Sequence, residues 1–337
     1  MAPRPSLALI FGCLLAACDP PAPAEAPSVA STSDASTGSG SLASSSEAVA
    51  TGAGSSGAAS SGSGGDATTS GSGCPTCGQA APVGNLDAPE LDEISGLAAS
   101  ALHPGVYFVH NDSGDLPRFY AIDGVGKRLA TYDVDGAFAV DWEDAAAGPC
   151  PAGRCLYFAD IGDNLAKRTT LTVYRVTEPS AIEPGSHHLA SEPLAFSYPD
   201  GSHDAETLLV HPTTGELFIV TKVVIGPSSL YRFPMPLTPG ATAMLEKIGE
   251  VPPPGGLARF TAGSIHPQGK GLLLRAYTAL YYYPITSTVA AALAGRPCSV
   301  PVAFEKQGET VEWTAKGDGY LTISEGGGAP VNLVGCP

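Results

Sequence analysis

The sequence predicts an all-β protein whose main domain is a five-bladed β-propeller. Short runs of alternating apolar and polar residues, separated by Gly, Pro, Asp and Asn, fill residues 74–337, and this pattern is typical of strands joined by turns. One unit of three strands also recurs five times in the same region, and internal repeats are the sequence signature of propellers and solenoids. A six-bladed ring is the alternative, although residues 74–337 offer no sixth set of strands.

Residues 1–18 have the features of a bacterial lipoprotein signal peptide. Arg4 supplies a positive charge, and Leu7–Leu15 is an apolar run too short to span a bilayer. The following Leu-Ala-Ala-Cys, which ends at Cys18, matches a lipobox, in which the cysteine thiol receives the lipid. We therefore expect a lipoprotein anchored in the cell envelope through Cys18, at the outer membrane or cell surface, with the inner membrane left open. An ordinary signal peptide with an incidental cysteine is the alternative.

Residues 19–73 form a low-complexity segment between this leader and the repeats. Of these 55 residues, 43 are Ser, Gly, Ala or Thr, and none is aromatic. Such a composition cannot bury enough apolar surface to offset the entropy of the chain. We therefore expect a disordered linker that holds the propeller, residues 74–337, away from the membrane.

The charge balance restricts the partners of the protein. Asp and Glu number 33 against 17 Lys and Arg, which gives a formal net charge of −16. Nucleic acids and anionic membrane surfaces both require a basic face, so they are excluded as partners of the propeller. Divalent cations, cationic ligands, glycans and proteins remain.

Cysteine usage agrees with export. Six of the eight cysteines lie after Cys18, and disulfides are the default in an oxidising compartment. Local spacing favours the pairs Cys74–Cys77, Cys150–Cys155 and Cys298–Cys336, among fifteen formal pairings. A zinc or redox centre at Cys74 and Cys77 is the alternative, but no second cysteine or histidine pair stands nearby to complete four ligands.

Each repeat begins with a polar residue that opens its first strand. In four copies, twelve positions separate this residue from the second residue of the next strand, as from Ser95 to Tyr107. The second copy has two additional residues, which lie in the hairpin between Cys150 and Cys155. The predicted strand sets are 95–99, 106–109 and 118–122; 143–147, 156–159 and 171–176; 206–210, 217–220 and 229–233; 261–265, 272–275 and 280–283; and 309–313, 320–323 and 331–334.

A fourth strand follows each of the first four copies, at 128–132, 194–198, 244–248 and 300–304. The fifth copy reaches the end of the chain after three strands. We expect Val83–Leu86 to supply the missing strand, because closure of the ring by the N-terminal segment removes the exposed sheet edges.

The opening residues are candidate ligands for a metal ion. The innermost strand of every blade lines the axis of a propeller, so the first residues of these strands converge. Three carboxylates and two hydroxyls would then meet and repel unless a cation neutralised them. Ca²⁺ accepts six to eight oxygen ligands in irregular geometry and is favoured over Mg²⁺; hydrogen bonding between strands without an ion is the alternative. The candidate ligands are Ser95, Glu143, Glu206, Thr261 and Glu309.

The loops after the second strands emerge on the same face as these openings. Their polar residues predict an acidic mouth with two cations at its rim, which is the default position for a ligand. Several of these polar residues, such as Asn111, also lie in sequences typical of turns, and a purely structural role in a turn is the alternative. The loop residues are Asn111, Asp112, Asp115, Asp160, Asp163, Lys222, Arg275 and Glu325.

The ring of opening residues resembles that of the calcium-activated nucleotidase (apyrase) family, in which Ser, Glu, Glu, Ser and Glu surround a central Ca²⁺. Here Thr261 replaces one Ser, and the segments at Glu93, Asp141 and Glu309 look like the blade openings of that family. The resemblance implies a metal beneath a phosphate pocket and hydrolysis of nucleoside di- and triphosphates. The chain is also similar to uncharacterised exported bacterial propellers, some of them grouped near esterase-like phytases.

Two functions therefore stand. In the first, a calcium-stabilised propeller binds a protein, a glycan or a small ligand on its top face. In the second, the protein is a calcium-dependent phosphohydrolase, nucleotidase- or phytase-like, acting at the central pocket. Its candidate bases are Asp112 and Asp160, and Lys222 and Arg275 would neutralise the phosphate. The first is favoured, because the mouth has few cations.

Overall fold

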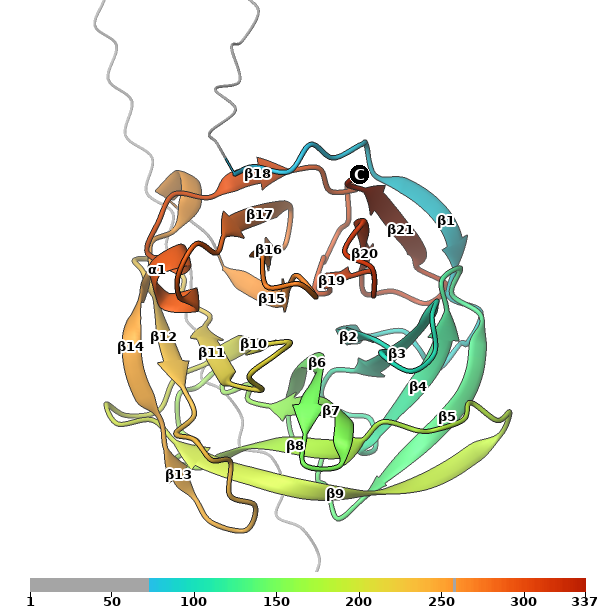
Figure 1. The fold of residues 1–337 in the computed structure, drawn as a ribbon. Coiled ribbons are helices and arrows are strands. Elements are labelled where there is room, and N and C mark those ends of the chain that lie inside the picture. Colours follow the sequence, from blue (N-terminus) through green and yellow to red (C-terminus); the bar gives the residue numbers. More distant parts are fainter. Residues whose placement is uncertain (1–72, 257–258) are drawn as a thin grey trace, which may run out of the picture. The chain divides into compact units, whose positions relative to one another are not determined.

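The computed structural model describes residues 73–256 and 259–337. The predicted signal peptide, Cys18 and residues 19–72 of the predicted linker lie outside the described residues. The regular structure of the described part is almost entirely β, with its strands arranged as four-stranded antiparallel units around a central axis (Figure 1). No helix in this part is long and apolar enough to cross a membrane.

Residues 73–256 and 259–337 form three four-stranded sheets and one nine-stranded sheet, in which the parallel pairing of β5 with β9 joins two four-stranded units. The all-β propeller prediction is confirmed. Each unit is a blade, and the first four blades run in sequence order from the axis to the rim, whereas the last takes its outermost strand from the N-terminal segment. Blade 1 is β2 (Ile94–Ala99), β3 (Val106–Asn111), β4 (Arg118–Asp123) and β5 (Arg128–Asp135); blade 2 is β6 (Trp142–Cys150), β7 (Gly153–Asp160), β8 (Leu171–Thr177) and β9 (Ser186–Ser197).

The remaining blades follow the same order. Blade 3 is β10 (Ala205–Val210), β11 (Leu217–Thr221), β12 (Ser228–Arg232) and β14 (Glu246–Val251), with the short β13 (Ala243–Met244) beside β9. Blade 4 is β15 (Phe260–Ile265), β16 (Gly271–Ala276), β17 (Ala279–Pro284) and β18 (Cys298–Val300), with α1 (Val289–Leu293) between its last two strands. Blade 5 is β19 (Glu312–Trp313), β20 (Gly319–Ile323), β21 (Pro330–Gly335) and β1 (Ala81–Asn85).

The N-terminal strand closes the ring, as the sequence predicts. β1 pairs antiparallel with β21, and Ala81 lies opposite Leu333. Figure 1 shows the blue β1 beside the dark red β21. The five inner strands also contact one another in cyclic order, β2 with β6, β6 with β10, β10 with β15, β15 with β19, and β19 with β2. The ring is therefore closed both at its axis and at its rim.

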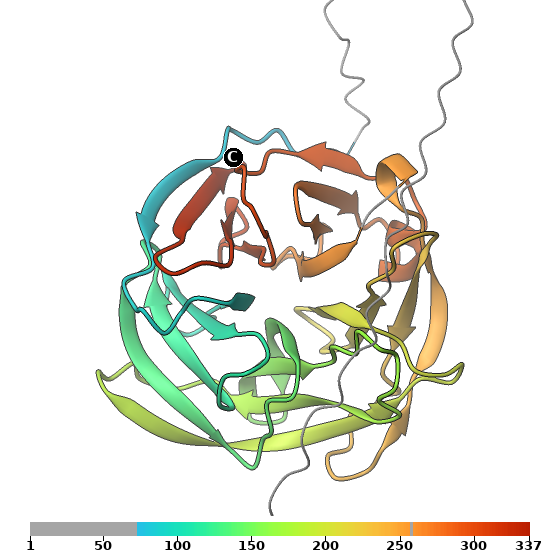
Figure 2. The same ribbon diagram turned by 180° about the vertical axis from the view of Figure 1, so that it is seen from behind.

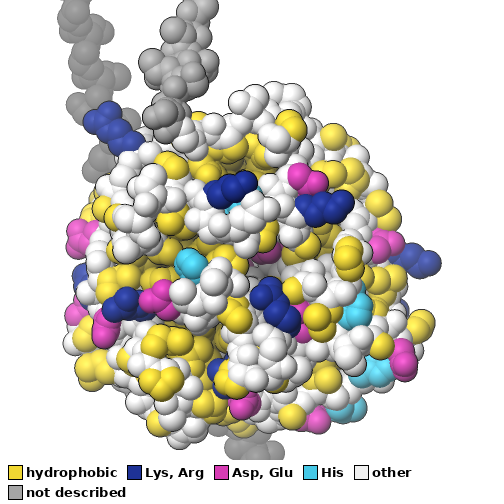
Figure 3. Space-filling model, in the orientation of Figure 1, with side chains coloured by type: hydrophobic (Ala, Val, Ile, Leu, Met, Phe, Trp, Pro, Cys, Tyr) yellow, Lys and Arg dark blue, Asp and Glu magenta, His cyan; other side chains and the backbone are white. Residues whose placement is uncertain are grey.

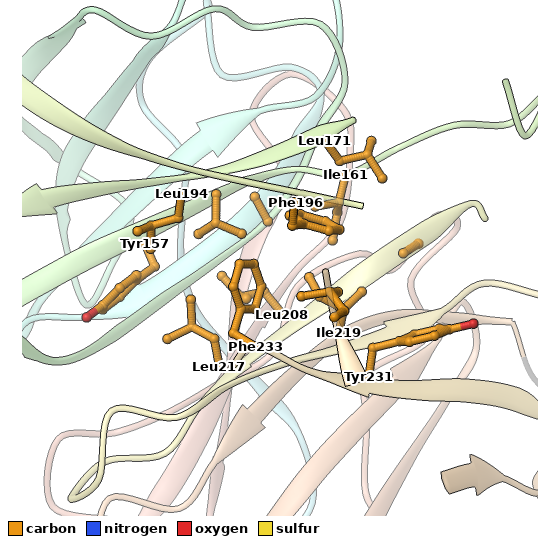
Figure 4. Packing of buried hydrophobic residues seen from close by; sticks show 14 of the residues in the cluster. Tyr157, Ile161, Leu171, Leu194, Phe196, Leu208, Leu217, Ile219, Tyr231 and Phe233 are labelled. Carbon is orange, nitrogen blue, oxygen red and sulfur yellow. The ribbon is translucent and has the colours of Figure 1, made fainter. Parts of the chain in front are cut away.

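The hydrophobic core is divided among the contacts between neighbouring blades. Each blade presents one apolar face to the blade before it and one to the blade after it, and five clusters of buried side chains result. Between blades 2 and 3, Phe196, Phe233 and Tyr231 pack with aliphatic residues of both sheets (Figure 4). Between blades 1 and 2, the rings of Phe119 and Phe158 stack with their centroids 4.7 Å apart. Stability thus depends on all five contacts, because removing any one blade would expose two apolar faces.

Asp144 connects three inner strands at the axis. Its side chain is 1% exposed and accepts hydrogen bonds from the backbone N–H groups of Ala145 (2.9 Å), Leu208 (2.9 Å) and Gly263 (3.3 Å). These donors belong to β6, β10 and β15, so one carboxylate joins blades 2, 3 and 4. Burial and the nearby Glu312 raise the pKa of Asp144, while the three N–H donors oppose that shift.

The rim is joined by one long strand and by disulfides. Residues 186–190 of β9 pair in parallel with β5 of blade 1, and residues 191–196 pair antiparallel with β8. The segment before β1 is bound to blades 4 and 5 by Cys74–Cys298 and Cys77–Cys336, whose Cα atoms are 6.0 and 4.1 Å apart. In the chain-entropy model, each disulfide closes a loop long enough to contribute about 5 kcal/mol.

These bonds correct the predicted pairing. Cys150–Cys155 closes the β6–β7 hairpin as predicted, but Cys74–Cys77 and Cys298–Cys336 are wrong. The prediction treated Cys74 and Cys77 as one local turn. Instead, the extended segment follows the outside of the last two blades, with the Gly78 N–H bonded to the Gly335 carbonyl (2.8 Å). Each cysteine therefore meets a different blade.

Replacing Asp144 tests its role at the axis. We expect Asp144→Ala to lower the free energy of unfolding by about 3 kcal/mol or more, because it leaves three buried N–H groups without an acceptor. Asp144→Asn, which retains one acceptor oxygen, should cost less. Urea unfolding followed by tryptophan fluorescence measures both, with the exposed Asp135→Ala as control. A cost below about 1 kcal/mol for Asp144→Ala would contradict the structural role.

Candidate functional site

The predicted ring residues share one structural feature: each lies at a bulge of its inner strand. In blade 1, Ile94 pairs with Asn111 but Gly96 pairs with His110, so Ser95 is the extra residue. The same shift occurs at Glu143, Glu206 and Thr261, and between the Gly308–Ser324 bridge and the Glu312–Leu321 pair around Glu309. A bulge re-aims the side chain of the extra residue. The constant spacing in the sequence is therefore the spacing of a repeated bulge.

The two hydroxyls of the ring connect neighbouring blades. Ser95 Oγ donates a hydrogen bond to the Glu143 carbonyl (2.5 Å), and Thr261 Oγ1 donates to the Gly308 carbonyl (2.9 Å). Both residues are fully buried. The hydroxyls thus hold the backbone of the next bulge in position, which is the hydrogen bonding between strands that the sequence left open as an alternative for the ring residues.

Three carboxyl groups meet beside this backbone. One ligand oxygen from each of Asp112, Asp141 and Glu143 lies within 4.8 Å of the others. Two like charges at that distance repel by about 3–4 kcal/mol at an effective dielectric constant of 20. Gly162 provides the space, because a Cβ there would collide with Glu143 Oε1 and Asp141 Oδ2. Among the described residues, no hydrogen-bond or ion-pair partner contacts the Glu143 carboxyl group, which is 3% exposed.

The pKa values of three carboxyl groups near the axis are raised by burial and by neighbouring negative charges. Burial raises the pKa of Glu143 well above its ordinary value, and the charges of Asp112 and Asp141 raise it further. Burial likewise raises the pKa of Asp112 to about 6, with smaller contributions from Asp141 and Glu325. Burial raises the pKa of Glu309 to about 9, and its hydrogen bond with Glu325 adds to the shift.

One lysine lies among the acids. Lys222 Nζ forms an ion pair with Glu206 Oε1, while Glu206 Oε2 is buried without a partner in the described structure. The ammonium group also lies 5.4 Å from the centroid of the Tyr277 ring. The charge of Lys222 opposes the raised pKa values of both Glu143 and Glu309, so these blades share one electrostatic environment. We call the set the axial acidic cluster; it consists of Asp112, Asp141, Glu143, Glu206, Glu309, Glu325 and Lys222.

Two of the predicted catalytic residues have structural partners. Asp160 forms an ion pair with Arg168 (2.7 Å) and accepts the Asp141 N–H (3.1 Å), so it positions Asp141. The prediction that Arg275 is a cation at the rim is wrong. Its side chain is fully buried, forms an ion pair with Glu305 and donates a hydrogen bond to the Thr310 carbonyl (3.0 Å). The strand β16 continues to Ala276, which places Arg275 inside the blade and not in the loop.

The other loop residues are divided between turns and the cluster. Asp163 accepts the N–H groups of Lys167 and Arg168 (2.9 and 2.7 Å). Asn111 donates to Asp115 (3.1 Å), which pairs with Arg118 (3.1 Å). These are local turn contacts, whereas Asp112, Lys222 and Glu325 belong to the axial acidic cluster.

Asp141 and Gly162 are functional residues that the candidate ligands predicted from the sequence do not include. Asp141 lies two residues before Glu143, across the bulge. A strand normally sends residues two apart to one face, and that spacing was the available signal. Nothing in the sequence marks Gly162, since its role depends on the approach of side chains from another loop.

Comparisons with known proteins are limited to the fold. No family model and no curated protein matches the sequence. Among solved structures, the chain is similar to the soluble aldose sugar dehydrogenase of Escherichia coli in its apo form, with 9% identity and a TM-score of 0.43 over 78% of this chain and 100% of that one. The axial acidic cluster is therefore interpreted from its own geometry.

The crowded carboxyl groups predict an unusual pH dependence. Their folded pKa values lie above the unfolded values, so the native state binds more protons and stability falls as pH rises through the folded pKa values. We expect the melting temperature of the chelator-treated protein to decrease between pH 5 and pH 9, and Glu309→Gln to raise it at pH 8 by about 3 °C. Differential scanning calorimetry measures both. A melting temperature that rises over this range would contradict the crowding.

Proposed function

We propose that the protein is an exported, membrane-tethered propeller that holds a calcium ion in its axial acidic cluster and binds a protein partner on the surrounding face. The observation that carries the proposal is the convergence of three carboxyl groups: one oxygen from each of Asp112, Asp141 and Glu143 lies within 4.8 Å of the others. Glu143 is only 3% exposed, and burying charged groups close to like charges is costly. A cation bound there would relieve all three groups at once.

The donor set fits a hard cation. The three side chains that converge offer only carboxylate oxygens, which suit Ca²⁺ and not a soft metal. Asp112, Asp141 and Glu143 would hold the ion, and the space left by Gly162 keeps two of these groups together. Bound calcium would supply positive charge and fix the relative positions of blades 1 and 2. The resemblance of the ring to calcium-activated nucleotidases supports the same choice of ion.

The surrounding face is rich in exposed apolar side chains. Two sets of loops lie on one side of the ring because the strands are antiparallel: the loops that precede the inner strands and the loops that follow the second strands. Figures 1 and 2 show the ring from its two opposite sides. Seven of the twelve large, exposed hydrophobic residues lie in these loops. Exposed apolar surface of this kind, around an acidic centre, suits a protein with apolar and basic side chains. The seven are Leu116, Phe138, Val140, Leu165, Val224, Ile225 and Phe304.

A calcium-dependent phosphohydrolase is the second candidate. It is favoured by Asp112, because a half-buried carboxyl group with a pKa of about 6 is suited to general base catalysis near neutral pH. Lys222 is the only one of the two proposed phosphate-binding cations that lies in the cluster, and it already pairs with Glu206. Arg275 pairs with the buried Glu305. Phosphate binding would thus require Lys222 to leave Glu206, and this favours the binding function.

A calcium titration tests the proposed metal. We expect saturating Ca²⁺ to stabilise the chelator-treated protein by about 2.7 kcal/mol at 100 times the dissociation constant. Glu143→Gln should remove most of this gain, because it deletes one ligand charge. Glu250→Gln, at a side chain that is 58% exposed on β14, is the matched control. Calorimetric titration and thermal melting provide the measurement; equal calcium stabilisation of Glu143→Gln and the unchanged protein would refute the assignment.

A phosphoester panel separates the two candidates. If the protein is a binder, we expect no hydrolysis of nucleoside di- or triphosphates, inositol hexakisphosphate or aryl phosphates with either Ca²⁺ or chelator. Calcium-dependent turnover that falls at least 100-fold in Asp112→Asn would instead establish the phosphohydrolase. Released phosphate is the readout.

A further inference from the structure

A second concave site lies at the opposite end of the axis. The bulges occupy the first residues of the inner strands, whereas Ala99, Val210 and Ile265 are their last residues. These three residues line a cavity of about 380 Å³. Figure 3 shows a hollow near the centre of one face, with a basic side chain at its edge. We call this space the basal cavity.

All five blades contribute to the basal cavity. Polar and apolar atoms contribute about equally to its lining, and its polar side chains are Ser100, Arg154, Glu312 and Thr314. A volume of this size is in the range of small-molecule sites. The lining residues from the five inner strands and their ends are Ala99, Ala147, Val210, Ile265, Glu312 and Trp313.

Arg154, on β7, is the cation of this cavity. Its guanidinium group makes no ion pair and no hydrogen bond with the described residues, and its Nε is buried without a partner. Every other arginine of residues 73–256 and 259–337 that is not exposed pairs with a carboxylate, although acids outnumber basic residues 33 to 17 in the sequence. The arginines with such partners are Arg118, Arg128, Arg168, Arg175, Arg232 and Arg275.

None of the nearby acids forms an ion pair with the guanidinium group in the described structure, although Glu178 Oε2 is buried without a hydrogen-bond partner. Burial raises the pKa of Glu312 to about 8, against the opposing hydrogen bonds of Ser264 and the Ala99 backbone, so this group is mostly neutral at pH 7. Asp144 lies deeper and is occupied by its three N–H donors. Glu178 Oε1 accepts from Ser100 Oγ and from two backbone N–H groups.

We propose that the basal cavity binds a small organic anion, with its carboxylate or phosphate group on Arg154 and its apolar body between the inner strands. A planar guanidinium group recognises such anions through two parallel hydrogen bonds. The walls of Ala, Val, Ile and Trp side chains would cover the rest of the ligand. This site is independent of the axial acidic cluster, because it uses other residues at the other end of the inner strands.

Three probes of one shape test the proposal: benzoate, phenyl phosphate and the neutral benzyl alcohol. Ligand-observed NMR titration of the intact protein should show saturable binding of at least one anion, and at least tenfold weaker binding of benzyl alcohol. Arg154→Gln should weaken binding of the anion at least tenfold, because it removes the charge and the paired donors. Arg154→Lys should give intermediate affinity. Arg296→Gln, at an exposed arginine after α1, is the matched control.

The outcomes separate clearly. Loss of anion binding in Arg154→Gln, with unchanged binding in Arg296→Gln and an unchanged circular dichroism spectrum, supports the site. The proposal is overturned if neither anion binds saturably, if benzyl alcohol binds equally well, or if Arg154→Gln binds like the unchanged protein. The same titration with Ca²⁺ or chelator should give equal affinities, so failure of the proposed calcium site would not affect the result.

Discussion

The concentration of carboxyl groups at one end of the axis is the constraint on which the rest of this structure depends. Five bulges in equivalent positions turn the first residues of the inner strands inward, and six acids face one lysine there. Proton binding relieves part of the repulsion, as the raised pKa values of Glu143 and Glu309 indicate. A bound cation would relieve it further and would make the blades mutually dependent on the ion.

The surrounding fold is built to hold this end together. Apolar clusters fill all five contacts between blades, and Asp144 joins three inner strands just behind the acids. At the rim, β9 connects the first blades, and two disulfides bind the N-terminal segment to the last two. The disulfides and the apolar contacts between blades thus hold the ring together against the repulsion between the carboxyl groups at the axis.

Much of the fold could be predicted from the sequence because its determinants are local. The twelve-residue spacing after Ser95, Glu206, Thr261 and Glu309 reflects one hairpin with one bulge, and a missing strand in the last repeat required β1 to close the ring. The pairing of Cys74 and Cys77 could not be predicted in this way, since it depends on the path of an extended segment across two blades. Arg275 failed for a related reason: its buried partner, Glu305, lies 30 residues further along the chain, and no local pattern indicates that pairing. Loop side chains that approach from different blades, as at Gly162, carry no signal along the chain.

The most direct test of the calcium centre is a crystal structure of the protein grown with Ca²⁺, with anomalous scattering used to locate the ion. The account predicts a single strong peak among the carboxylate oxygens of Asp112, Asp141 and Glu143, with Lys222 still beside Glu206 or turned toward Tyr277. Density showing the Lys222 ammonium group bonded to Glu143, with no ion at the axis, would contradict it.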